Sequence, residues 1–219
     1  MTVQSHQASH LFQLRGANGL LAEEHFDLAD SRARIFCIGY LLLLDTLDNV
    51  ISPDGTTGAS VLLERASALG FKTFVDAVSE DSDRFAAVVR PTLPHVDYLV
   101  INEFEASRCR SRCWTRRRNR QRFAGCGCGP ILLNSGVREW VVIHWPDGAV
   151  ACIATEPRKA RHGGVRVPPA DIVGAAGAGD AFAAGMLYGL HEGLDIRGAC
   201  ARRSAPPPRI FTTPPAPAG

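Results

Sequence analysis

The sequence of 219 residues contains no long hydrophobic run and carries little net charge, +2. Its longest apolar stretch, Ile35–Leu44, is about half of the roughly 20 residues that a membrane-spanning helix needs. The first ten residues are polar and lack the apolar core of a secretory signal peptide. Hydrophobic residues nevertheless reach 46%, enough for a packed core. We therefore exclude membrane-spanning, collagen-like and fully disordered proteins and expect one main globular domain.

Two segments contain no acidic residue at all. Ser107–Arg122 holds eight arginines, and residues 199–219 hold three. Without these eleven arginines the chain has 13 basic and 22 acidic residues, a net charge of −9. The near-neutral net charge is thus the sum of an acidic body and two arginine-bearing segments. It indicates neither a nucleic-acid partner nor a membrane partner.

Apolar runs alternate with helical patterns from Ala33 onward, which is typical of an α/β protein with a parallel sheet. The run Arg34–Leu44 predicts a strand buried on both faces. Further strands are expected at 71–77, 96–101, 139–144 and 149–154, and helices at 57–69, 82–89 and 177–192. The side chains expected to face the core are Val61, Leu62, Ala66 and Leu69 in the first helix and Ala181, Met186, Leu187 and Leu190 in the last.

The periodicity fails twice. Residues 107–130 show no apolar period, although a helix should cover the sheet there. After Gly198 the chain becomes proline-rich, with six prolines in its last 14 residues. We therefore expect one domain over residues 1–198, interrupted by an Arg/Cys-rich insert or loop at 107–130, and a disordered tail at 199–219.

The strongest local feature is a glycine-rich stretch that leads into a helix. The backbone amides of Gly177, Ala178 and Gly179 can point at an anion, and the helix dipole favours negative charge there. Asp180, in the first turn, can accept a proton from a hydroxyl group. Such an arrangement suits phosphoryl transfer, whereas a merely capping Asp180 is the structural alternative. No Lys-Ser/Thr pair follows, which excludes a P-loop.

A second feature, Asn102-x-x-Glu105, follows a buried strand, where α/β sheets place ligand sites. An amide and a carboxylate three residues apart can share one face of a helix and hold hydrated Mg²⁺ through water. The alternative is an Asn at a helix entry with a solvated Glu.

Together these motifs resemble those of the PfkB carbohydrate kinase family, which has the ribokinase-like fold. GAGDAFAAGML resembles the family's C-terminal signature, and VDYLVINEFEA resembles the strand and Asn-x-x-Glu motif that precede it. RGANGLLAEEHFD, KTFVDAVSEDSDRF and VREWVVIHWPDGA add support. The resemblance covers two blocks, Arg15–Ala106 and Gly136–Gly193.

The resemblance implies a three-layer α/β/α fold with a mostly parallel sheet, and ATP-dependent phosphotransfer to a sugar hydroxymethyl group in the cytoplasm. Asp180 would be the catalytic base, and Gly177, Ala178 and Gly179 the anion hole. Asn102 and Glu105 would organise Mg²⁺, and the loop at Asp147 and Gly148 would contact ATP. The implied cofactors are ATP and Mg²⁺; the implied partners are a small sugar and, as in many family members, a second copy in a homodimer.

The sequence also departs from the family. The resemblance begins part way along the family pattern, so the lid and the Gly-Gly and Asp-Gly sugar-binding motifs have no counterpart. Gly174-Ala175 stands where many members have Asp-Thr, which argues against the usual monovalent-cation site. The chain could therefore be an active kinase or a catalytically dead remnant.

Three interpretations of the two unusual segments stay open. Cys109, Cys113, Cys126 and Cys128 could bind zinc, although their spacing is poor. The run Arg116–Arg120 could make the chain an arginine-rich nucleic-acid binder. Both segments could instead be shifted-frame translation, which the abrupt loss and return of periodicity favours. Elsewhere, Cys37 and Cys152 lie in apolar strands and are expected to be buried, reduced thiols.

Overall fold

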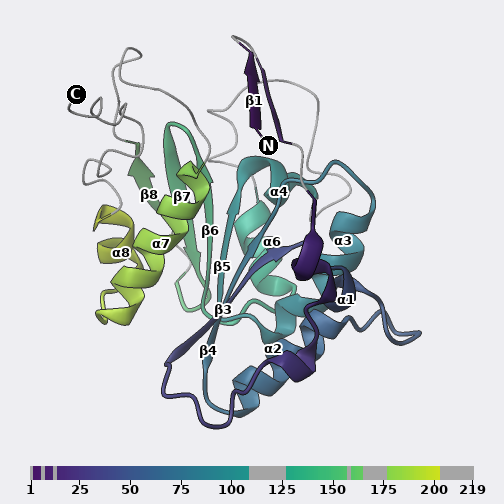
Figure 1. The fold of residues 1–219 in the computed structure, drawn as a ribbon. Helices are drawn as coiled ribbons and strands as arrows, with labels where there is room; N and C mark the ends of the chain where they lie inside the picture. The colour runs from purple at the N-terminus through teal and green to yellow at the C-terminus, as the bar shows by residue number, and fades with distance from the viewer. Residues whose placement is uncertain are drawn as a thin grey trace, which may run out of the picture.

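A six-stranded sheet forms the centre of the computed structural model (Figure 1). The structure describes residues 2–5, 8–11, 14–108, 127–156, 159–164 and 177–202, with side chains described only between residues 14 and 200. The strand order is β3-β4-β5-β6-β7-β8. The first four strands are parallel, and β7 and β8 are antiparallel to their neighbours. These strands are β3 (Ile35–Leu41), β4 (Lys72–Ala77), β5 (Tyr98–Asn102), β6 (Trp140–Trp145), β7 (Gly148–Ile153) and β8 (Ala160–Gly163). A separate hairpin pairs β1 (Thr2–Ser5) with β2 (Ala8–Leu11).

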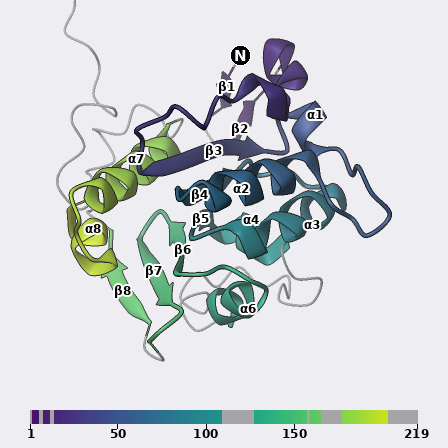
Figure 2. The same ribbon diagram turned by 90° about the horizontal axis from the view of Figure 1, so that it is seen from below.

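Helices cover both faces of the sheet, which gives three layers (Figure 2). One face carries α2 (Gly58–Ala68), α3 (Arg84–Val89), α4 (Glu103–Arg108) and α6 (Cys128–Asn134). The other face carries α7 (Ala178–His191) and α8 (Ile196–Arg202). Short elements complete the described chain: η1 (Gly16–Leu20), η2 (Glu23–His25), α1 (Asp45–Asp48) and η3 (Arg90–His95). The predicted α/β/α architecture with a mostly parallel sheet is confirmed.

Side-chain alternation along the strands builds a separate core on each face. In β5, Leu99 and Ile101 belong to the core beneath α2, α3 and α6, and Tyr98 and Val100 belong to the core beneath α7 and α8. Strands buried on both faces read as continuous apolar runs, which is why the central strands could be predicted. Of the described part of the chain, no helix is both long and apolar enough to cross a membrane.

Helix α2 forms where the spacing predicts it. Thr57 caps its start, because its Oγ1 accepts the Ser60 amide at 3.2 Å while the Thr57 amide donates to Ser60 Oγ at 3.0 Å. Leu62 and Ala66 are fully buried as expected. Leu69 is not: it is the C-cap and stays 49% exposed, because the chain turns away at Gly70, where φ is +90°.

The prediction that the first strand is buried on both faces is wrong. β3 is an edge strand, and its two faces differ: Phe36 and Ile38 are buried, whereas Cys37 is exposed. A continuous apolar run does not reveal whether a neighbour covers each face, since that depends on distant parts of the chain. Cys152 in β7 is buried as expected.

Two boundaries also need correction. Residues 128–130, assigned to the unusual insert, form the start of α6, in which Cys128, Gly129 and Leu132 are buried. Residues 199–202, assigned to the disordered tail, belong to α8, where Ala199 and Cys200 have no exposed surface. Both helices have only seven residues, too few turns to show a clear period in the sequence. The other three cysteines of the zinc hypothesis, the run Arg116–Arg120 and the rest of the tail lie outside the described residues.

Candidate active site

The site is built around the carboxyl end of β5, where Asn102 ends the strand and α4 begins. The Asn102 backbone amide donates to Glu105 Oε2 at 2.8 Å, and its Nδ2 donates to Glu105 Oε1 at 2.7 Å. In return, Asn102 Oδ1 accepts the backbone amides of Phe104 and Glu105, both at 2.9 Å. The pair thus caps the first turn of α4 in both directions, and the spacing of three residues makes this possible.

Glu105 is buried, not solvated as the structural alternative supposed; 3% of its surface is exposed. Ser79, in the loop after β4, donates its hydroxyl to Glu105 Oε1 at 2.7 Å and accepts Asn102 Nδ2 at 2.8 Å. Burial raises the pKa of Glu105 to about 7, although the hydrogen bonds from Asn102 and Ser79 act in the opposite direction. The carboxyl is therefore held in one orientation and is poised between its two protonation states near neutral pH.

Asp76, near the end of β4, is a second acid at this site, and the sequence reasoning assigned it no role. Burial, and then the negative charge of Glu105, raise its pKa to about 7. One Asp76 oxygen accepts the Ala77 amide at 2.8 Å. The sequence signal for Asp76 is its place at the carboxyl end of a strand adjacent to β5. By alternation along β4, Asp76 lies on the same face as Phe74 and on the opposite face to Val75.

These acids suit a hydrated divalent cation. A carboxylate offers about four lone-pair positions, and the two Glu105 oxygens already accept three hydrogen bonds. Glu105 therefore fits a contact to Mg²⁺ through water better than direct coordination, whereas Asp76 retains more open positions. Within the described residues no three acidic, His or Cys side chains group closely enough to hold a metal on their own.

The glycine-rich stretch begins α7. Gly177 is the N-cap and has a left-handed backbone, φ +81°, which glycine adopts without strain. The first intrahelical bond runs from the Ala181 amide to the Gly177 carbonyl, 2.9 Å, so the preceding amides of Ala178 and Gly179 have no partner within the helix. Asp180 is exposed in this first turn. The helix start can thus receive an anion, with a carboxyl group beside it.

An aromatic contact joins this helix start to the sheet. The His144 and Phe182 rings are stacked, with centroids 4.6 Å apart and an interplanar angle of 26°. His144 lies near the carboxyl end of β6 and is directly opposite Asn102 in the register with β5. At the other end of α7, Arg34 donates to the His191 carbonyl. The two contacts place the start of α7 near the carboxyl end of β6 and its last residue near the beginning of β3, so Asp180 shares its end of the sheet with Asn102 and Glu105.

The Asp147–Gly148 loop is the tight turn between β6 and β7, also at the carboxyl end of β6. The Asp147 carbonyl accepts the Gly164 amide at 2.7 Å, which ties the turn to the end of β8. A Cβ on Gly148 would lie 2.6 Å from the His162 carbonyl oxygen, so the close approach of β8 requires glycine here. Gly174 and Ala175, which stand where many family members have the Asp-Thr pair of a monovalent-cation site, lie outside the described residues.

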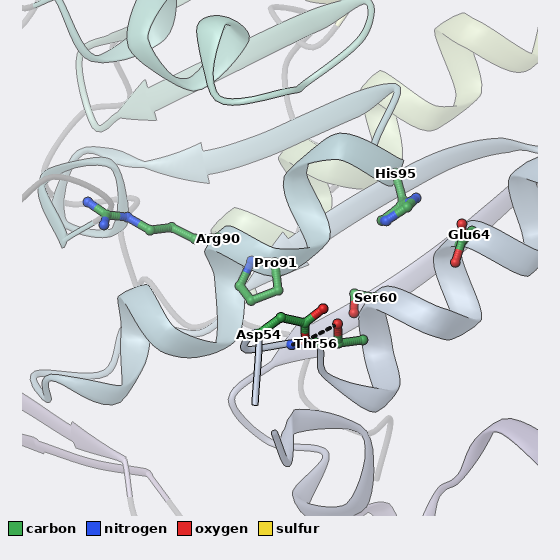
Figure 3. A pocket seen from close by; sticks show the side chains of 7 residues that line it. All are labelled: Asp54, Thr56, Ser60, Glu64, Arg90, Pro91 and His95. Carbon is green, nitrogen blue, oxygen red and sulfur yellow. Dashed lines mark hydrogen bonds between the residues drawn. The ribbon is translucent and has the colours of Figure 1, made fainter. Parts of the chain in front are cut away.

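A surface hollow of about 430 Å³ lies apart from these residues, between α2, η3 and the loop before α2 (Figure 3). It is lined by Asp54, Thr56, Ser60, Glu64, Arg90, Pro91 and His95. The Asp54 carboxylate accepts the Thr56 amide at 3.0 Å and its hydroxyl at 2.7 Å, and Arg90 extends away from both acids. None of the candidate site residues lines this hollow, so we assign it no part in the chemistry.

The fold has many relatives of known structure, and the three described here have 17–20% sequence identity to this chain. Adenosine kinase from Anopheles gambiae in complex with P1,P4-di(adenosine-5) tetraphosphate is 17% identical, with a TM-score of 0.63 over 79% of this chain and 49% of that one. Ribokinase from Thermotoga maritima is 18% identical, with a TM-score of 0.62 over 90% and 57%. Arabidopsis thaliana ribokinase complexed with ribose and ATP is 20% identical, with a TM-score of 0.53 over 67% and 43%. The chain thus spans roughly half of each of these proteins.

The family is shown by the sequence itself. No curated protein sequence matches the chain. The model of pfkB family carbohydrate kinases, however, matches residues 2–205. This match begins before Arg15 and ends beyond Gly193, so it is wider than the two blocks recognised from motifs. The chain belongs to the pfkB family of carbohydrate kinases.

Proposed function

We propose that this chain carries the phosphotransfer machinery of a kinase that moves the γ-phosphoryl group of ATP to a hydroxymethyl group of a sugar or related carbohydrate. One observation carries the proposal: the start of α7, with Asp180 in its first turn, lies at the same end of the sheet as the Asn102–Glu105 pair. The proposed base, the proposed anion-binding helix start and the acid that would organise the cation thus lie at one end of the sheet, as an in-line transfer requires.

In the proposed mechanism the sugar hydroxyl loses its proton to the Asp180 carboxylate as its oxygen attacks the γ-phosphorus of ATP. The bond between this phosphorus and the β,γ-bridging oxygen breaks, and ADP leaves. The amides at Gly177, Ala178 and Gly179 stabilise the charge that develops on the transferred phosphoryl oxygens. Glu105, oriented by Asn102 and Ser79, and the neighbouring Asp76 would hold the water shell of Mg²⁺. The cation would neutralise charge on the phosphates of ATP.

The Asp147–Gly148 turn is proposed to contact the nucleotide, because it lies at the same end of the sheet as Asn102. At Gly148 the contribution would come from the backbone alone, since glycine has no side chain. The choice of sugar is left open, because the motifs that select it in the family have no counterpart in this sequence.

The test is ADP release from ATP and Mg²⁺ with a panel of sugars and nucleosides. Asp180→Asn removes the base at nearly constant shape, and Asp30→Asn is a matched control at an exposed position. We expect turnover with at least one acceptor, lowered about 10²- to 10⁴-fold in Asp180→Asn and unchanged in Asp30→Asn. Equal turnover in all three proteins would contradict the role of Asp180 as the base, and no turnover in any of them would favour a catalytically dead remnant. In a separate binding assay, salt-sensitive retention on RNA or DNA would favour the nucleic-acid binder.

A further inference from the structure

The contact between His144 and Phe182 joins the carboxyl end of β6 to the second turn of α7, the helix that carries Asp180. Phe182 is two residues after Asp180 and is buried, with 8% of its surface exposed. Residues two apart on a helix point in nearly opposite directions. The ring of Phe182 therefore faces the sheet while Asp180 remains exposed to solvent.

The sheet presents a surface that fits this ring. On one side of His144 lies Asn102 in β5, and on the other side lies Ala149 in β7, which is fully buried. Directly opposite residues in adjacent strands point to the same face, so all three belong to the face that α7 covers. Ala149 contributes only a methyl group to this face beside His144.

We infer that His144 is a positioning residue, whose ring fixes the first turns of α7, and with them Asp180 and the helix amides, relative to Asn102 and Glu105. This inference rests on the proposed function for its effect on catalysis, but its structural part stands independently. Because phosphotransfer depends on the alignment of base, acceptor and phosphate, a small shift of the helix start lowers the rate even if the fold survives.

We expect the aromatic ring of His144, rather than its nitrogen atoms, to hold the start of α7 in place. An imidazole that contacted phosphate directly would act through its N–H groups, which phenylalanine lacks. His144→Phe keeps a flat ring for stacking and removes the N–H groups, whereas His144→Asn keeps polar groups and removes the aromatic ring. These two variants, with His144→Ala, separate positioning from direct contact.

Hydrogen exchange of the full chain provides a readout that does not need activity. We expect the amides of Ala181–Gly185 to exchange roughly 2- to 10-fold faster in His144→Ala and His144→Asn, as loss of one aromatic pair predicts, and at the wild-type rate in His144→Phe. The amides of Leu187–His191, in the same helix, should not change in any variant. Unchanged exchange in His144→Ala, or faster exchange throughout α7 and the sheet, would overturn the inference.

The kinetic arm uses the same variants. With the preferred acceptor, His144→Ala and His144→Asn should lose about 10- to 100-fold in kcat with little change in KM for ATP, and His144→Phe should recover most of kcat. A His144→Phe variant as slow as His144→Ala, with normal exchange in α7, would mean that His144 contacts substrate directly and would overturn the positioning role. If the wild-type chain transfers no phosphate, the proposed function fails, while the exchange data still decide whether His144 holds α7.

Discussion

Asn102 and Glu105 hold each other through three hydrogen bonds of 2.7 to 2.9 Å: two from Asn102 to the Glu105 carboxylate, and one from the Glu105 amide back to Asn102 Oδ1. This reciprocal arrangement serves two purposes. It caps α4, and it compensates for the burial of an acid at the carboxyl end of the central strand. The same residues can therefore be tested as structural elements before any substrate is known.

Replacing Asn102 with alanine should destabilise the chain by about 1–3 kcal/mol, because Glu105 loses a donor in a buried position and α4 loses its cap. Urea unfolding followed by circular dichroism measures the change. Asn49→Ala is the control, since Asn49 is exposed. If both variants unfold at the same urea concentration, the Asn102–Glu105 pair contributes no net stability.

The raised pKa values of Glu105 and Asp76, each about 7, predict a dependence of stability on pH. In the unfolded chain both carboxyls lose their protons near pH 4, whereas the folded chain keeps them to about pH 7. The free energy of unfolding should therefore fall as the pH rises from about 5 to 7, by at most about 1.4 kcal/mol per pH unit for each carboxyl. Glu105→Gln should flatten this slope in a urea titration repeated at several pH values; a slope identical to that of the wild type would show that the pKa of Glu105 is not raised.

Gly129 tests whether α6 is a packed part of the fold. A Cβ at this position would lie 2.3 Å from Cys152 Sγ and 3.1 Å from Cys152 Cβ. Gly129→Ala should therefore destabilise the chain by about 1–3 kcal/mol, and Cys152→Ala in the same chain should relieve part of the loss. Gly163→Ala is the control, because nothing lies within 4 Å of the added Cβ. Thermal unfolding that does not distinguish Gly129→Ala from Gly163→Ala would mean that α6 does not pack on β7.

Gly179 tests the anion hole without disturbing the fold. Nothing lies within 4 Å of a Cβ added there, and alanine is the better helix former. Gly179→Ala should therefore keep or slightly raise the melting temperature, by up to about 1 kcal/mol in free energy, while the methyl group lowers phosphotransfer at least 10-fold by crowding the approach to the helix amides. Full activity in this variant would remove Gly179 from the anion hole.

Much of the fold could be predicted because the central strands are apolar on both faces and α2 and α7 carry clear periods. The edge position of β3 could not be predicted. Phe36 is buried and Cys37 is exposed because distant segments of the chain cover one face of this strand more than the other. α6 and α8 escaped notice because they are short, seven residues each. In the site, Asn102, Glu105 and Asp180 were visible as motifs, whereas Asp76 and His144 were not, because their relation to the site depends on strand register.

The product of the reaction provides the sharpest test of the kinase proposal. The full chain, incubated with ATP, Mg²⁺ and a pooled set of sugars, would be followed by phosphorus NMR for a new phosphomonoester. We predict an ester signal that grows in step with ADP in the wild type and in Asp30→Asn, and that is reduced about 10²- to 10⁴-fold in Asp180→Asn. No ester from any of the three proteins, or equal ester from all of them, would contradict Asp180-dependent phosphotransfer by this chain.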